Sequence, residues 1–212
     1  TSIGLSAFDS CISLTSVTIG NGVTSIGYDA FYGCTSLTSI DIPSGVISIY
    51  GSAFDECHSL TSVTIPSSVT LIGKEAFRDC RLDTLTLNCN IPNGMNQLSY
   101  FDGALSEAYF KSVVIGDSVT TIGDWAFSGF NRYWGDDSHL KTIYIGKSVE
   151  RIGEGAFNEC TNLTELYVHR DVPPTLEGGN DLSAATIYVP APVVAAYKSA
   201  EGWKEFADQI EG

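Results

Sequence analysis

Small and apolar residues return along the chain at a fixed phase, and the unit Leu37–Ser59 shows the pattern clearly. From Ile40 to Ile42 apolar and polar side chains alternate, which is typical of a strand with one buried face. The next three residues, Pro-Ser-Gly, predict a turn. A second β-branched run, VISI, follows, and the phrase AFDEC at residues 53–57 has the pattern of one helical turn.

One such unit is too small to fold alone. Burying its larger side chains yields about 1.5–3 kcal/mol each. Ordering the chain costs roughly 1.5 kcal/mol of conformational entropy per residue. Stacked units avoid the deficit, because each strand pairs with the next and each apolar surface is covered by its neighbour. The pattern therefore predicts a solenoid, in which each repeat forms one rung.

The leucine position of the unit recurs along nearly the whole chain. It marks about eight rungs, at Leu14, Leu37, Leu60, Leu82, Phe110, Leu140, Leu163 and Ala184. We expect parallel strands near residues 14–19, 37–42, 60–65, 82–87, 110–115, 140–145, 163–168 and 184–189, joined by right-handed crossovers. Two longer intervals predict inserted loops near residues 89–109 and 131–139, which contain more Gly, Asn, Asp and aromatic residues than the repeats.

The C-terminal segment departs from the repeat. We expect the solenoid to cover residues 1–189 and a helical cap to cover residues 190–212, where Pro192 lies near a helix start. Its small and apolar residues recur at roughly helical spacing, at Ala196, Tyr197, Trp203, Phe206 and Ile210, and the aromatic ones are interpreted as core rather than as a cofactor site. The predicted fold is α/β, with short helical turns on the outer side of the solenoid.

The cysteines follow the same phase. Cys11, Cys34, Cys57 and Cys80 are 23 residues apart, and Cys160 ends the equivalent phrase IGEGAFNEC. One cysteine per repeat at a constant phase indicates a buried core position that favours a small, soft side chain. We favour free thiols over disulfides, since neighbouring rungs point their side chains in parallel directions. Cys89 falls outside the phase.

Charge restricts the partners. The chain has 11 Lys and Arg against 25 Asp and Glu, a net charge of −14. Such a surface repels nucleic acids, whose binding needs basic side chains, and disfavours anionic membranes. No apolar run approaches the ~20 residues of a spanning helix, so membrane insertion of this segment is not expected. Thr1 falls within a repeat, so we expect the natural chain to extend further at its N-terminus. Without that extension, we expect the first rung to present an uncapped apolar edge that promotes self-association.

Chemistry-bearing motifs are sparse. The sequence has no GxSxG nucleophile motif, no GxGxxG and no phosphate loop. The three histidines, His58, His139 and His169, lack companions at metal-ligand spacing and are interpreted as solvated. Asp136, Asp137 and His139 offer a weak alternative as a cation site, although the calcium-loop pattern is missing. We therefore expect a protein that is not an enzyme and uses no cofactor or metal.

The repeat LTSVTIPSSVTLIGKEAFRDC, residues 60–80, resembles the BspA-type leucine-rich repeat of bacterial proteins. The tail VPAPVVAAYKSAEGWKEF is similar to an end segment found on such proteins from Gram-negative gut anaerobes. The pattern is broken at Tyr50, where other phrases have Gly, and at Phe130, where they have Cys. The resemblance implies a secreted or cell-surface protein, of a Gram-negative bacterium, that binds host proteins or other cells.

The leading hypothesis is a non-catalytic extracellular scaffold for protein binding or adhesion, whose partner is a host or bacterial surface protein. A glycan-binding module and a structural spacer that holds another domain at the cell surface are alternatives. An enzyme with its chemistry in the inserted loops is a further alternative, disfavoured by the missing nucleophile and base.

Outward-facing residues identify a candidate site. The second outward position of each rung carries Thr18, Asp41, Thr64, Thr86, Val114, Tyr144, Tyr167 and Tyr188. The last three predict a stack of tyrosines at rung spacing, with Glu165 and His169 beside it and with Tyr133 and Trp134 of the inserted loop as one wall. Tyrosine is enriched at binding hot spots. Alternatively, the stack only stabilises the sheet, since such pairs contribute roughly 0.2–1 kcal/mol.

Overall fold

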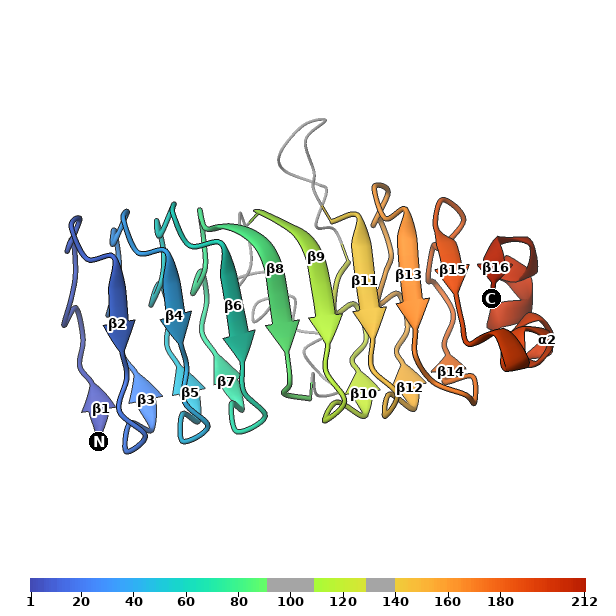
Figure 1. Ribbon diagram of the computed structural model, residues 1–212, viewed down its shortest axis with the longest axis horizontal. Helices are drawn as coiled ribbons and strands as arrows, with labels where there is room; N and C mark the ends of the chain where they lie inside the picture. The colour runs from blue at the N-terminus through green and yellow to red at the C-terminus, as the bar shows by residue number, and fades with distance from the viewer. Residues whose placement is uncertain (91–108, 129–139) are drawn as a thin grey trace. The chain divides into compact units, whose positions relative to one another are not determined.

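The computed structural model describes residues 1–90, 109–128 and 140–212 (Figure 1). Most of both inserted loops therefore lies outside the described residues. The chain divides into two compact units, whose main parts are Thr1–Cys89 and Lys111–Gly212. Each unit is built from parallel strands and is described by itself.

The first unit contains two sets of parallel strands. One longer strand per rung forms the first set: β2 (Ser16–Thr18), β4 (Ser39–Asp41), β6 (Ser62–Ile65) and β8 (Arg81–Leu87). Within it, β2 pairs with β4 and β6 pairs with β8. The second set is a sheet of two-residue strands in chain order: β1 (Ser2–Ile3), β3 (Ser25–Ile26), β5 (Ser48–Ile49) and β7 (Leu71–Ile72).

The second unit repeats this arrangement. Its longer strands follow one another in parallel pairs: β9 (Tyr109–Ile115), β11 (Thr142–Ile145), β13 (Glu165–Val168), β15 (Thr186–Tyr188) and β16 (Ile210–Glu211). Its short strands form a three-stranded sheet: β10 (Thr121–Ile122), β12 (Arg151–Ile152) and β14 (Thr175–Leu176).

A strand in a parallel pair occupies each of the eight predicted positions, which confirms the main prediction of the fold. Six of these strands begin two residues after the predicted leucine position. The leucine closes the preceding turn instead, because the Leu37 N–H donates to the Cys34 carbonyl. Ala184 was the wrong residue for the last rung, since it is exposed while Leu182 and Ala185 are buried.

The AFDEC phrase forms consecutive turns rather than the expected helical turn. Ser52 and Glu56 have left-handed backbone, with φ of 52° and 59°. The N–H groups of Ser52, Phe54 and Glu56 donate to carbonyls of the next rung, at Lys74, Ala76 and Arg78. A helix would direct these donors within the segment. Because every second N–H of this segment donates to the neighbouring rung, this side of the solenoid forms a third hydrogen-bonded ladder beside the two sets of strands.

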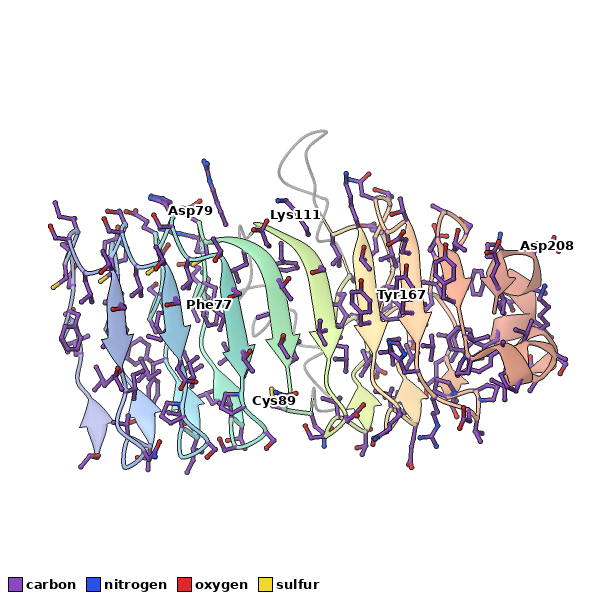
Figure 2. The ribbon with its side chains drawn as sticks, in the orientation of Figure 1. Phe77, Asp79, Cys89, Lys111, Tyr167 and Asp208 are labelled. Atoms are coloured by element: carbon purple, nitrogen blue, oxygen red, sulfur yellow. The ribbon has the colours of Figure 1, made fainter. Side chains whose placement is uncertain are left out.

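Phenylalanines of the same phrase form a column inside each unit. The rings of Phe8, Phe31, Phe54 and Phe77 stack with centroids 5.1–5.2 Å apart. Phe127 and Phe157 stack at 5.9 Å in the second unit. Phe77 is labelled in Figure 2, where the side chains of the described residues are drawn. Apolar burial and stacking thus hold successive rungs at one phase, as the repeat pattern predicts.

The repeat-phase cysteines are free thiols, and all but one are buried. Each buried one donates its S–H to the carbonyl of the phenylalanine one rung earlier, as Cys57 does to Phe31 at 3.3 Å and Cys160 to Phe127 at 3.0 Å. Burial raises the pKa of the Cys160 thiol to about 12. The expectation of burial was wrong for Cys11, which is exposed because no earlier rung in this sequence covers it.

The C-terminal segment forms a cap of short helices, drawn in red in Figure 1. Its elements are η2 (Ala191–Val193), α2 (Val194–Ser199) and η3 (Trp203–Gln209), followed by β16. Tyr197 and Trp203 are fully buried, as expected for core residues. Their polar atoms bond to the preceding rung: Trp203 Nε1 donates to the Pro174 carbonyl and the Tyr197 hydroxyl to the Arg170 carbonyl, both at 2.7 Å. The added strand β16 was not predicted.

Candidate binding surface

Three tyrosines lie in register on the outward face of β11, β13 and β15. Tyr144 pairs with Tyr167, and Tyr167 pairs with Tyr188. Because side chains alternate along a strand, the residues on either side of each tyrosine, such as Ile143 and Ile145, point into the core. We call Tyr144, Tyr167 and Tyr188 the tyrosine row, whose middle residue, Tyr167, is labelled in Figure 2.

The rings of the tyrosine row form one stack. The centroids of Tyr144 and Tyr167 are 4.8 Å apart, and those of Tyr167 and Tyr188 are 4.7 Å apart, with the planes within 15° of parallel. All three side chains are half-buried. Both faces of the Tyr167 ring are therefore covered by its neighbours, and the solvent meets ring edges and hydroxyl groups. The sequence prediction of a stack at rung spacing is confirmed.

Glu165 and His169 lie beside this stack. The Glu165 carboxylate accepts a hydrogen bond from the Thr142 hydroxyl at 3.2 Å and belongs to the neighbouring row of outward residues. Partial burial in the stack, with a contribution from the Glu165 charge, raises the pKa of Tyr167. The exposed His169 ring is nearly parallel to that of Tyr144, with centroids 6.5 Å apart. Five of the seven predicted residues are thus brought together, while Tyr133 and Trp134 lie outside the described residues.

A depression beside Tyr144 was not foreseen from the sequence. It has a volume of about 390 Å³ and is lined by Val114, Ile115, Gly116, Asp117, Tyr144, Gly146 and His169. Val114 pairs in register with Tyr144, so a small side chain occupies the place where the next tyrosine of the row would lie. Two glycines, Gly116 and Gly146, leave the adjoining positions without side chains. The signal was present in the sequence as a valine in the outward series followed by a glycine two residues later.

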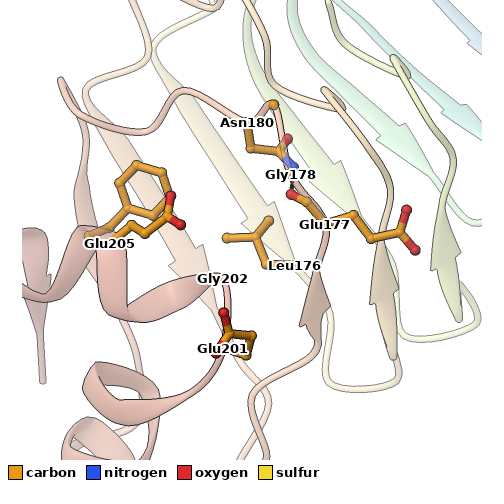
Figure 3. A pocket seen from close by; sticks show the side chains of 9 residues that line it. Leu176, Glu177, Gly178, Asn180, Glu201, Gly202 and Glu205 are labelled. Atoms are coloured by element: carbon orange, nitrogen blue, oxygen red, sulfur yellow. Dashed lines mark hydrogen bonds between the residues drawn. The ribbon is translucent and has the colours of Figure 1, made fainter.

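A second pocket of about 230 Å³ lies between the loop after β14 and the cap (Figure 3). Carboxylates lie at its walls, but Glu177 is bound by Arg151 at 2.7 Å and Glu201 by Lys204 at 2.6 Å. The Asn180 amide donates to the Glu177 carbonyl at 2.7 Å and shapes the loop. The polar groups named here are thus engaged by neighbouring residues of the protein, and we interpret the pocket as a structural crevice at the cap.

The described residues contain no group of three or more His, Cys, Asp or Glu side chains placed to hold a metal ion. His58 and His169 are both exposed. The weak cation site at Asp136, Asp137 and His139 falls outside the residues described. Within the described ranges, no helix is both long and apolar enough to cross a membrane.

Comparison with known proteins places the repeats in a family. The model of the BspA type leucine rich repeat region matches six copies over residues 1–102 and 91–174. No curated protein matches the chain.

Solved structures with a similar fold include three bacterial leucine-rich repeat proteins. A protein from T. pallidum is 19% identical, with 99% of this chain and 78% of that chain covered and a TM-score of 0.34. A protein from Bacteroides ovatus is 20% identical, with 99% and 68% covered and a TM-score of 0.42. A leucine rich cell surface protein from Faecalibacterium prausnitzii is 22% identical, with 99% and 66% covered and a TM-score of 0.40.

Proposed function

The chain belongs to the BspA-type leucine-rich repeat family, and we propose that it is a non-catalytic scaffold that binds a protein partner through the tyrosine row. The partner is a host or bacterial surface protein, and the binding takes place outside the cell or at its surface. The resemblance of the repeats and of the C-terminal tail to surface and secreted proteins motivates this localisation.

The observation that carries the proposal is the ordered stack of Tyr144, Tyr167 and Tyr188 on an outward face. Its half-buried rings present flat apolar edges with hydroxyl groups at the rim. Each tyrosine is held by its neighbours, so little side-chain entropy is lost when a partner covers it. Rigid aromatic side chains of this kind dominate the energy of many protein interfaces.

Two alternatives remain distinct from this proposal. A spacer would need no ordered aromatic row, although the row also contributes roughly 0.2–1 kcal/mol per pair to the sheet. A glycan module needs an accessible ring face against which the C–H groups of a sugar ring can pack. The stack covers both faces of Tyr167, which favours a protein partner over a glycan at the centre of the row.

The test begins with a screen of the purified chain against host matrix proteins and a glycan array. For the partner found, Tyr167→Ala should weaken binding by about 30-fold or more, which corresponds to ~2 kcal/mol. The matched control is Thr64→Ala, which truncates the outward position of β6 in the first unit. A drop in melting temperature with unchanged affinity in the Tyr167 variant would leave only the stabilising role and refute the proposal.

A further inference from the structure

The tyrosine row is unequal at its two ends. Tyr167 is stacked on both faces, whereas one face of Tyr144 is stacked on Tyr167 and the other borders the depression. Val114, the register partner of Tyr144, is too short to cover that face. Within the described ranges, the depression therefore offers an aromatic face of Tyr144 that is less covered than either face of Tyr167.

Two glycines, Gly116 and Gly146, belong to the lining of the depression. A Cβ atom on Gly146 would lie 2.8 Å from the Gly116 carbonyl carbon and 2.9 Å from Asp117 Oδ1, which are too close for any other residue without a shift of the backbone. The backbone segments that follow β9 and β11 therefore approach each other closely, and Gly116 and Gly146 contribute no side chains there. The resulting volume of about 390 Å³ is large enough for one long side chain of a partner.

The Asp117 carboxylate lies at the rim of the depression, where it is paired with Lys147. Asp117 Oδ1 accepts a hydrogen bond from the Lys147 backbone N–H at 3.1 Å, and this bond keeps the pKa of Asp117 below its usual range. Its other oxygen lies 3.4 Å from Lys147 Nζ, in an ion pair whose side chains are 58% and 69% exposed. Surface pairs of this kind contribute little and exchange readily. A carboxylate is thus available next to an aromatic face, on a chain with a net charge of −14.

From this combination we infer that the depression beside Tyr144 binds a basic side chain of the partner, and arginine in preference to lysine. A guanidinium group can stack on the open Tyr144 face while it pairs with the Asp117 carboxylate, and its planar shape suits both contacts. A sugar would need several polar groups around its ring, whereas the described lining of the depression has, besides the Tyr144 hydroxyl, only Asp117 and His169 as polar side chains. The inference rests on the proposed function and specifies the chemistry of the partner.

The probes are small enough to bind without any partner protein. Peptides acetyl-Gly-Arg-Gly-amide, its lysine and citrulline counterparts, and methyl glycosides are titrated into the ¹⁵N-labelled chain. The arginine peptide should shift the Gly146 amide resonance saturably, the lysine peptide should bind more weakly, and the neutral citrulline peptide should bind at least tenfold more weakly than arginine. Equal binding of the citrulline peptide, or saturable shifts from a glycoside and none from arginine, would overturn the inference.

Variants locate the binding. Asp117→Asn should weaken arginine binding about tenfold, while Asp41→Asn, with the same change in charge at an outward position of the first unit, should leave it unchanged. Val114→Tyr should cover the open face of Tyr144 and abolish binding without loss of melting temperature. Full arginine binding by the Val114 variant would refute the assignment. This experiment can succeed or fail independently of the Tyr167 test, since it uses no partner and leaves the rest of the row intact.

Discussion

In the first unit the outward position of the longer strands carries Thr18, Asp41, Thr64 and Thr86, whereas in the second the equivalent position carries Val114 and then Tyr144, Tyr167 and Tyr188. The interiors of the two units do not differ in this way. Both bury a phenylalanine column and a cysteine that donates to the carbonyl of the previous phenylalanine.

The difference separates two kinds of constraint. An inward residue must match the rung before it and the rung after it, so the same residue types recur in both units. An outward residue is limited only by solubility and strand propensity, so it is free to vary. Where outward residues become uniform again, as in the tyrosine row, packing of the interior does not explain the choice, and binding is the reason that we propose.

The largest expected effect concerns the cap, which belongs to the second unit. Trp203→Ala removes a fully buried ring and its hydrogen bond to the Pro174 carbonyl. It should lower the free energy of unfolding of this unit by about 3–5 kcal/mol. Hydrogen exchange should show lost amide protection in β13 and β15 and unchanged protection in β3 and β5. Equal loss in both sets would contradict a stabilising effect that is confined to the rungs next to the cap.

A second contrast lies between two rungs at the residue after the buried phenylalanine, which is Asp55 after Phe54 in the first unit and Asn158 after Phe157 in the second. Burial raises the pKa of Asp55 to about 6, although the ion pair with Arg78 at 3.0 Å opposes the shift. The folded chain therefore binds this proton more tightly than the unfolded chain, in which an Asp has a pKa of about 3.9. The contribution of Asp55 is most favourable below pH ~4 and is lost as the pH rises through 6.

Asp55→Asn tests this contrast by giving the first unit the residue of the second. Between pH 4 and 7, the free energy of unfolding of the unchanged protein should fall relative to that of the variant by about 1–3 kcal/mol. Urea denaturation at each pH measures the difference. A constant difference across this range would show that Asp55 does not titrate there.

The interiors should respond equally to loss of the cysteine. Cys57→Ala and Cys160→Ala each remove a buried sulfur and its hydrogen bond, and each should cost about 1–2 kcal/mol. Cys11→Ala is the control, since Cys11 is exposed and should tolerate the change. A thiol reagent should modify Cys11 alone in the folded protein and all six cysteines after denaturation. A clear difference between the two buried sites would break the equivalence of the interiors.

The smallest effect should follow from exchanging outward residues. Tyr167→Thr should cost roughly 0.4–2 kcal/mol, because it loses two cross-strand pairs of about 0.2–1 kcal/mol each. Thr64→Tyr should change stability less, because no other tyrosine lies in register with it in the first unit. Thermal melts of both variants decide the point. A loss well above ~2 kcal/mol in the Tyr167 variant would show that the row is mainly structural.

The sequence was informative where a side chain must match its neighbours in adjacent rungs. The strand positions and the tyrosine stack were predicted because each depends on the repeat phase alone, and the core role of Trp203 was predicted from the helical spacing of the cap residues. The turns at Ser52 and Glu56 were not predicted, since AFDEC by itself fits a helical turn. Hydrogen bonds to the adjacent rung, which the local sequence does not reveal, favour the turns instead. The depression beside Tyr144 was missed because it arises from side chains that are absent at Gly116 and Gly146.

The third ladder, in which Ser52, Phe54 and Glu56 donate to the next rung, determines how a unit responds to mechanical force. Each rung is held along the longer strand, the two-residue strand and the turn side, so it resists tension as one piece. Once its bonds yield, 23 residues are released together, as the spacing of Cys34, Cys57 and Cys80 shows. A fully stretched rung adds about 80 Å of chain. Pulling should therefore extend the first unit in nearly equal steps, and each step would dissipate load before the next rung is strained.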